Sequence, residues 1–158
     1  MMAQESGKTA AGPSVRFPPP LVFLGFVLLG PLIEHFVTVP PLAGWWQLGA
    51  TLIVLGVVPL AMAQGLFRKT GENPVPWTAT GEIIDSGIYG VTRNPMYLGM
   101  TIISLGLAVV LHSWLALLLL PIAVSVIDTQ VIASEEPYLA GKFGAPYRAY
   151  MARVPRCL

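Results

Sequence analysis

The sequence predicts an all-α integral membrane protein with four transmembrane helices and a C-terminal amphipathic helix at the cytoplasmic surface. Hydrophobic residues make up 54% of the 158 residues and charged residues only 11%, against about 25% charged residues in ordinary soluble domains. The mean hydropathy is +0.69. Four apolar runs, each near the length that a bilayer requires, alternate with polar segments.

The composition also excludes several classes of function. Nine Lys and Arg residues against eight Asp and Glu leave a net charge of +1, so we expect no nucleic-acid partner. The single cysteine, Cys157, excludes an intramolecular disulfide and a multi-cysteine metal site. Because His35 and His112 belong to separate segments, we predict no metal site at all.

The N-terminal part is expected to contain a tail and a first membrane helix. Residues 1–16 are polar or small and are predicted to be a disordered cytoplasmic tail, and residues 17–158 a single membrane domain. The apolar run 21–39 is long for a signal-peptide core, and no small-x-small cleavage site follows it. We therefore expect a first spanning helix at roughly 17–38.

The second helix is predicted from its anchors as well as its length. Prolines at 40–41 end the first helix, and tryptophans at 45–46 lie where interfacial aromatics belong. Residues 47–67 form an apolar stretch of ~20 residues, the length that a bilayer requires. The cations at 68–69 close this stretch.

The third and fourth helices are predicted to form a tight hairpin. Their apolar runs cover 96–111 and 114–133, and only His112 and Ser113 separate them. The third run is short, so it is expected to span with local bilayer thinning or with help from neighbouring helices.

The cations set the expected orientation. By the positive-inside rule, both termini and the polar loop 68–97 are expected to face the cytoplasm. All nine cations fall on one side of the four helices: Lys8, Arg16, Arg68, Lys69, Arg93, Lys142, Arg148, Arg153 and Arg156.

Beyond the fourth run, a surface helix is predicted, and a helix start at Ser134 is an alternative interpretation of the two glutamates that follow it. Ser134 followed by Glu135, Glu136 and Pro137 is typical of a helix N-terminus, where one glutamate can cap the helix while the other binds a ligand. Aromatic and apolar residues then recur at helical spacing, which predicts a short helix at the membrane surface. They are Phe143, Tyr147, Tyr150 and Met151.

The polar residues concentrate in two cytoplasmic segments, 81–99 and 135–156. Each borders one limb of the predicted hairpin, so we expect the two segments to meet in space. Tyr89 and Tyr97 supply flat faces for a ring, and Glu135 places a carboxylate near the bilayer, where such a group is costly and usually functional. A cationic, purine-bearing ligand would fit this set.

These segments resemble the isoprenylcysteine carboxyl methyltransferase family, which is related to the membrane phospholipid N-methyltransferases. Residues 87–99 read Gly-x-Tyr-x-x-x-Arg-Asn-Pro-x-Tyr-x-Gly, and two glutamates follow at 135–136. Residues 143–155 then read Phe-Gly-x-x-Tyr-x-x-Tyr-x-x-Arg-Val-Pro. The resemblance covers about residues 68–156.

The resemblance implies S-adenosylmethionine (SAM) as the cofactor, held by the half 68–156. Glu135 would bind the amino-acid end or the ribose of the cofactor, and a lipophilic substrate would enter sideways from the membrane lipids. The remaining cofactor contacts that it implies are Ile83, Ile84, Tyr89, Asn94, Pro95, Met96 and Tyr97.

Two departures from the eukaryotic members concern the acceptor. Those enzymes have histidine where this chain has Asn94, which cannot titrate, so no acid–base role is placed there. They also have an arginine that contacts the prenylcysteine substrate, four residues before the double glutamate, where this chain has Val131. We therefore expect poor turnover of a prenylcysteine.

Arg93 and Glu136 are the predicted catalytic residues. Methyl transfer from a sulfonium is an in-line displacement, so positioning and desolvation can supply most of the acceleration. Arg93 is expected to hold an anionic acceptor bidentately, or else to anchor the loop to lipid phosphates. An amine acceptor must lose a proton, and Glu136 is the nearest candidate base. Carboxylate, thiol and amine acceptors all stay open.

Three alternatives accompany this hypothesis: a phospholipid N-methyltransferase, an NADPH-dependent membrane reductase, and a non-catalytic membrane scaffold. The reductase would need several cations for the NADPH phosphates, whereas the motif loop offers Arg93 alone. The sequence sets no oligomeric state. Outside the motifs, Asp128 is expected to contact the third helix or a substrate cavity, and Glu34 to hydrogen-bond His35.

Overall fold

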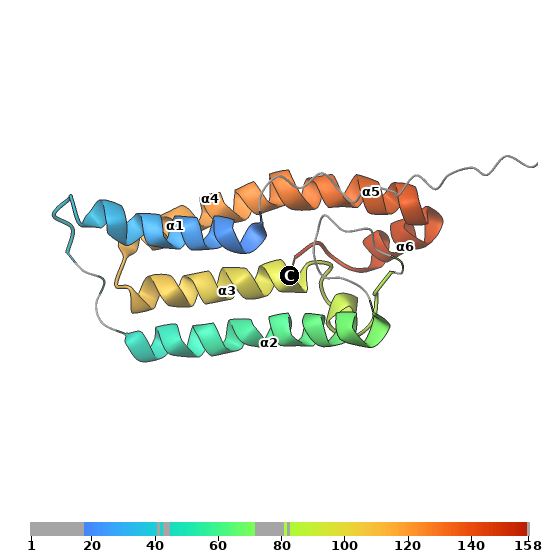
Figure 1. The fold of residues 1–158 in the computed structure, drawn as a ribbon, viewed down its shortest axis with the longest axis horizontal. Coiled ribbons are helices and arrows are strands. Elements are labelled where there is room, and N and C mark those ends of the chain that lie inside the picture. Colours follow the sequence, from blue (N-terminus) through green and yellow to red (C-terminus); the bar gives the residue numbers. More distant parts are fainter. Residues whose placement is uncertain (1–17, 41, 43–44, 72–80, 82, 158) are drawn as a thin grey trace, which may run out of the picture.

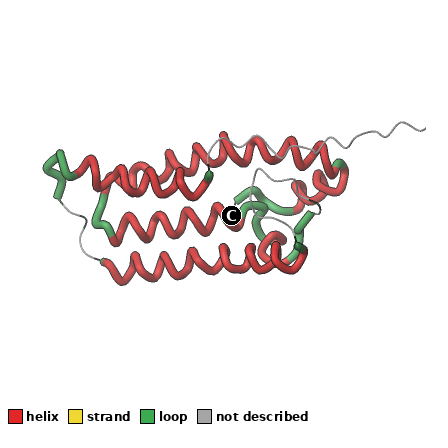
Figure 2. The backbone as a smooth tube through the Cα atoms, viewed as in Figure 1, coloured by secondary structure: helices red, strands yellow, loops and turns green. Residues whose placement is uncertain are grey.

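The structure is a computed structural model that describes residues 18–40, 42, 45–71, 81 and 83–157. The tail predicted for residues 1–16 lies outside the described residues. All regular structure in the described ranges is helical, and none of it is β-strand (Figure 2). The predicted all-α class is thus confirmed for this part of the chain.

The helices follow the apolar runs of the sequence. A single continuous helix covers residues 114–143 and contains a π-helical turn, η2, between α4 and α5. The elements in chain order are α1 (Pro19–Glu34), α2 (Trp46–Thr70), the 3₁₀ turn η1 (Gly87–Gly90), α3 (Pro95–Val110), α4 (Trp114–Val126), η2 (Ile127–Ile132), α5 (Ala133–Phe143) and α6 (Ala145–Arg153).

Two of these helices are long and apolar enough to cross a membrane. They are Trp46–Thr70, with 25 residues, and Trp114–Phe143, with 30 residues. The apolar helices α1 and α3 have 16 residues each, which is a length of about 24 Å. Since a bilayer core is about 30 Å thick, length alone qualifies two of the four predicted spans.

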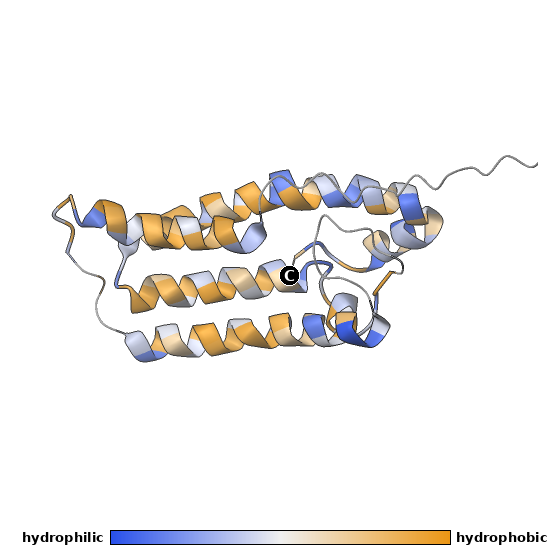
Figure 3. Ribbon diagram, in the orientation of Figure 1, coloured by the Kyte–Doolittle hydropathy of each residue, from blue (hydrophilic) through white to orange (hydrophobic). Residues whose placement is uncertain are grey.

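The four long helices form a bundle in which α3 lies between α2 on one side and the α1–α4 pair on the other (Figure 1). Orange, apolar residues run along the whole bundle, whereas hydrophilic residues gather at the end that holds α5, α6 and η1 (Figure 3). We call this end the polar end of the bundle.

Glycines bring α2 and α3 into close contact. A Cβ atom on Gly56 would lie 2.7 Å from the carbonyl oxygen of Gly99, and one on Gly106 would lie 2.6 Å from that of Gly49. Backbone therefore packs against backbone at two levels, as it does at small-residue contacts between membrane helices.

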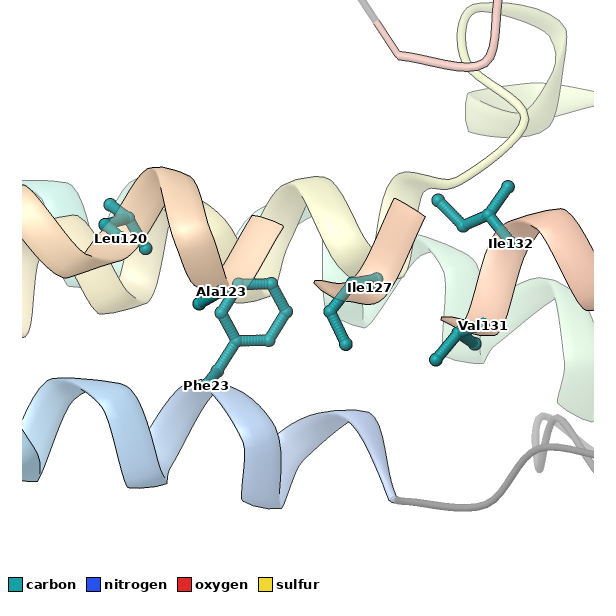
Figure 4. Packing of buried hydrophobic residues seen from close by; sticks show 6 residues of the cluster. All are labelled: Phe23, Leu120, Ala123, Ile127, Val131 and Ile132. Carbon is teal, nitrogen blue, oxygen red and sulfur yellow. The ribbon is translucent and has the colours of Figure 1, made fainter. Parts of the chain in front are cut away.

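The α1–α4 contact is built from branched and aromatic side chains. Phe23 of α1 faces the buried side of the long helix, as Figure 4 shows. The buried residues that it joins are Leu120, Ala123, Ile127, Val131 and Ile132.

At the end of the bundle opposite the polar end, side chains cap α4. Ser113, the predicted hairpin residue, accepts a hydrogen bond from the Ala116 amide at 3.0 Å. Glu34 of α1 accepts one from the Leu115 amide at 2.8 Å. The carboxylate of Glu34 therefore satisfies a free helix amide of another element instead of the predicted partner, His35.

The alternative interpretation of Ser134 as a helix start is not borne out. The helix continues through this position, and the Ser134 hydroxyl donates to the carbonyl of Val131 at 2.7 Å, inside the helix. Ile127, Val131 and Ile132 are each 2% exposed, so a break here would uncover a face that packs against α1. Tertiary packing thus outweighs the local capping signal.

Candidate functional site

The two polar segments meet at the polar end of the bundle, as predicted. The Tyr97 hydroxyl donates to Oε1 of Glu135 at 2.9 Å, and the Tyr150 hydroxyl donates to the carbonyl of Tyr89 at 2.8 Å. The first turn of α3 is therefore joined to α5 by one bond, and the loop before α3 is joined to α6 by the other.

Local sequence explains how the loop enters α3. Pro95 occupies the first turn of α3, where its missing amide hydrogen costs nothing, and its side chain is fully buried. Asn94, directly before it, does not cap the helix with its side chain. Instead, Nδ2 of Asn94 donates to the carbonyl of Arg156 at 2.9 Å. The amide predicted to face a cofactor thus also fastens the C-terminal segment.

Glu135 and Glu136 point to different partners. Consecutive residues of a helix lie about 100° apart around its axis. Glu135 accordingly reaches Tyr97 on α3, whereas Oε1 of Glu136 accepts a hydrogen bond from Arg93 at 2.7 Å. Tyr97 is the one hydrogen-bond partner of Glu135 among the described residues.

Glu136 is the centre of a four-residue charge network. Arg156 donates through Nε to Oε1 of Glu136 at 3.0 Å and through its second terminal nitrogen to Oε2. Its other terminal nitrogen donates to Oδ1 of Asp128 at 3.0 Å. The hydrogen bonds to Glu136 raise the pKa of the Arg156 guanidinium, so this group stays cationic. Asp128 thus pairs with the C-terminal segment and not with the predicted third helix.

Two buried tyrosines, Tyr147 and Tyr150, and the half-buried Tyr89 lie at the polar end of the bundle. Burial raises the pKa of Tyr89, with the neighbouring Tyr150 as the next cause, and burial likewise raises the pKa of Tyr147 and of Tyr150. These hydroxyls therefore remain protonated donors at neutral pH. The Tyr89 ring also packs edge-on against Phe67 of α2, with ring centroids 5.9 Å apart.

Three of the predicted cofactor contacts are apolar: Ile83, Ile84 and Met96. Ile83 packs against the buried cluster of Tyr147, Tyr150 and Val154. Both tyrosines are 5% exposed, so their rings contribute to packing at the polar end of the bundle. Residues Ile84 and Met96 are half-buried.

Two buried polar atoms lack a partner within the described ranges. They are Nε of Arg93 and the hydroxyl of Tyr138. Unsatisfied buried polar groups are uncommon in folded proteins, and an absent ligand or water is one ordinary explanation. In the same part of the chain, no group of three or more His, Cys, Asp and Glu residues could hold a metal ion.

Sequence reasoning missed two residues of this site. Arg156 was seen only as a flanking cation, and Thr92, which is 1% exposed and donates to the Arg156 carbonyl at 3.2 Å, was not singled out. The available signal was the position of Arg156 directly after the Arg-Val-Pro motif.

Comparison with known proteins gives a family and two curated relatives. Residues 45–146 match the family model described as phospholipid methyltransferase. A stretch of 73 residues is 34% identical to protein-S-isoprenylcysteine O-methyltransferase of Schizosaccharomyces pombe, covering 46% of this chain and 31% of that protein. A stretch of 123 residues is 28% identical to protein-S-isoprenylcysteine O-methyltransferase B of Arabidopsis thaliana, covering 70% of this chain and 58% of that protein.

These matches therefore span less than two thirds of each relative. No solved structure matches the chain significantly.

Proposed function

The chain belongs to the phospholipid methyltransferase family, and from this premise we propose that it transfers a methyl group from SAM to a lipophilic, membrane-associated acceptor. The resemblance seen in the motifs is confirmed by the family match. The observation that carries the proposal is the hydrogen bond between Tyr97 and Glu135, which joins the first turn of α3 to the double glutamate at the polar end of the bundle.

The side chains at and around this pair have the chemistry that SAM requires. The cofactor carries positive charge, and Glu135 offers a carboxylate whose single hydrogen-bond partner, within the described residues, is Tyr97. Tyr89 offers an aromatic ring fixed by Phe67, and Pro95 is rigid and buried. We assign the cofactor contacts to these residues together with Ile83, Ile84, Asn94, Met96 and Tyr97.

When bound, SAM supplies an electrophilic methyl group. The residues of this chain orient the reactants and exclude water, since a displacement at a sulfonium depends chiefly on positioning. Arg93 is the group that holds an anionic acceptor, because its buried Nε has no partner in the described part of the chain.

Glu136 is better suited to orienting Arg93 than to removing a proton. It accepts hydrogen bonds from Arg93 and from Arg156, and a protonated Glu136 would lose these charge-assisted bonds. This favours an acceptor that needs no general base, such as a carboxylate or a thiolate, over an amine.

Phospholipid N-methyl transfer is the second candidate. The family description favours it, and so does Val131, which occupies the position of the prenylcysteine-contacting arginine in the eukaryotic enzymes and is 2% exposed in the α1–α4 core. A side chain buried there cannot reach a polar substrate group.

We also propose four membrane spans with the polar end of the bundle at the cytoplasmic face. The short apolar helices α1 and α3 would span with local thinning of the bilayer. The described cations that favour this orientation lie at or near the polar end: Arg68, Lys69, Arg93, Lys142, Arg148, Arg153 and Arg156. A bacterial inner membrane would be the location.

Calorimetric titration of SAM into the purified protein in detergent tests the proposal. Saturable binding is expected, and the absence of heat at any SAM concentration would contradict it. NADPH is the matched control for the reductase alternative, and it should not bind. Lipid analysis of a deletion strain against wild type would then identify the acceptor.

A further inference from the structure

We propose that Arg156 is a positioning residue that holds Glu136, and through Glu136 holds Arg93 ready for the acceptor. This inference deepens the proposed function and rests on it for the identity of the reaction. Its physical content, the fixed placement of one guanidinium by another, can be measured without any methyl transfer.

Hydrogen bonds hold the main chain at Pro155 and Arg156 in place. The Arg93 amide donates to the carbonyl of Pro155 at 2.9 Å, and Thr92 and Asn94 both donate side-chain hydrogen bonds to the carbonyl of Arg156. Val154, two residues earlier, is 1% exposed. The C-terminal segment is thereby fastened to the start of α3.

The side chain of Arg156 then crosses to the long helix. Its planar guanidinium takes both oxygens of Glu136 and still reaches Asp128 in η2. A guanidinium that binds a carboxylate through two parallel bonds fixes the plane of that carboxylate, which an ammonium cannot do. Arg156 therefore fixes the orientation of Glu136.

This orientation decides what Arg93 can do. Because Arg156 engages both oxygens of Glu136, Arg93 reaches the carboxylate through one terminal nitrogen only. The Nε of Arg93 is left buried and without a partner in the described ranges. Without Arg156, Glu136 would be free to take Arg93 through two bonds and so occupy the donors that an acceptor needs.

The chain supplies a matched control close by. Arg153 pairs with Asp85 at 2.8 Å, but the two side chains are 64% and 50% exposed, whereas those of Arg156 and Glu136 are 37% and 17% exposed. Exposed pairs contribute little, so a change at Arg153 should leave the network in place.

The experiment follows the Nε–H resonance of Arg93 in nitrogen-15 spectra of the full chain in detergent, assigned with Arg93→Lys. We expect this resonance to shift and to lose its protection from hydrogen exchange in Arg156→Lys, and to shift less in Asp128→Asn, because the Arg156 and Asp128 side chains are 37% and 44% exposed. Arg153→Lys should leave it unchanged. Melting temperatures show whether each variant is folded, and Asp128→Asn supplies a second arm because it leaves Arg156 itself in place.

Methyl transfer is measured in parallel, as tritium from labelled SAM that enters the lipid extract of membranes from the expressing cells. We expect Arg156→Lys to lower the rate by about 100-fold with unchanged SAM affinity, as a misplaced catalytic group does. An unshifted Arg93 resonance in folded Arg156→Lys would overturn the proposal.

The two proposals fail separately. If the resonance shifts but wild type transfers no methyl group, the positioning stands and the proposed function falls. If wild type is active and Arg156→Lys is as active as Arg153→Lys, Arg156 only fastens the chain end, and the positioning proposal is wrong.

Discussion

Glu135 and Glu136 are adjacent in α5 but have different partners at the polar end of the bundle. Glu135 accepts a hydrogen bond from Tyr97 of α3, whereas Glu136 accepts hydrogen bonds from Arg93 and Arg156. A carboxylate with a single hydroxyl partner can still bind a cation, but a carboxylate between two guanidinium groups is already neutralised. The two glutamates should therefore differ in what their loss affects.

Glu135→Gln should weaken SAM binding while leaving folding nearly unchanged. The variant loses a charge-assisted contact to the cofactor, which is worth about 1.5–3 kcal/mol and thus roughly 10- to 100-fold in affinity. Calorimetric titration of SAM, with melting temperatures measured without ligand, gives both quantities.

Glu136→Gln is the control for that variant and should show the reverse. It leaves the partly buried Arg93 without its counter-charge and leaves Arg156 with Asp128 alone, so its melting temperature should fall. SAM affinity should stay near that of wild type. If Glu136→Gln weakens SAM binding and Glu135→Gln does not, the two assignments are exchanged.

The acceptor prediction rests on Val131. Valine is uncharged, and this side chain is buried in the core beside Phe23. It therefore offers no cation to a prenylcysteine, and a farnesylated cysteine analogue should be a poor substrate. The measurement is methyl-ester formation on that analogue, compared with methyl incorporation into membrane lipids. Efficient ester formation would refute the prediction.

At the scale of residues, the sequence suggested individual side chains but not the ion pairs between them. Motif spacing led us to propose Arg93, Tyr97 and Glu135, and the structure joins the last two by a hydrogen bond. The charge network was hidden because Arg156 lies 20 residues from Glu136 and 28 from Asp128 in sequence. No periodicity links such positions, and only the docking of the C-terminal segment brings them together.

At the scale of elements, apolar periodicity and length were sufficient for the helices. The α3–α4 hairpin was predicted because only two residues interrupt its apolar runs. The helix start at Ser134 failed because serine and acidic residues signal an N-terminus only where nothing holds the chain helical. Here the buried face of η2 continues the helix, and the π-helical turn lies next to the predicted break.

The glycine contacts between α2 and α3 lead to a stability prediction. In Gly56→Ala, the new Cβ would lie 2.7 Å from the carbonyl oxygen of Gly99, so the two backbones must separate. Such overpacking typically costs about 1–3 kcal/mol. Unfolding in mixed detergent micelles should show this loss.

Gly65→Ala on the same helix is the matched control. Nothing lies within 4 Å of the Cβ it would add, and alanine is the better helix former, so a gain of roughly 0.5–1 kcal/mol is expected. Equal stabilities for the two variants would mean that α2 and α3 do not pack this closely.

At the scale of the whole molecule, the four-span proposal predicts where a reporter works. A reporter that is active only in the cytoplasm should give signal when fused after Leu158 or inserted near Glu72. It should be silent when inserted at Ala43, which lies in the opposite connection of the proposed topology. Signal at Ala43 would overturn the proposed orientation.

The bond from the Leu115 amide to Glu34 also has a consequence for the order of assembly during synthesis. Its two ends are 81 residues apart in sequence. At 5–20 residues per second, the carboxylate of Glu34 waits roughly 4–16 seconds for its partner to be made. By the end of that interval α3 is complete, since it ends at Val110, and it can already pair with α2. The first helix to be made is therefore among the last to be fastened, and a nascent chain that stalls before Leu115 leaves Phe23 without its core.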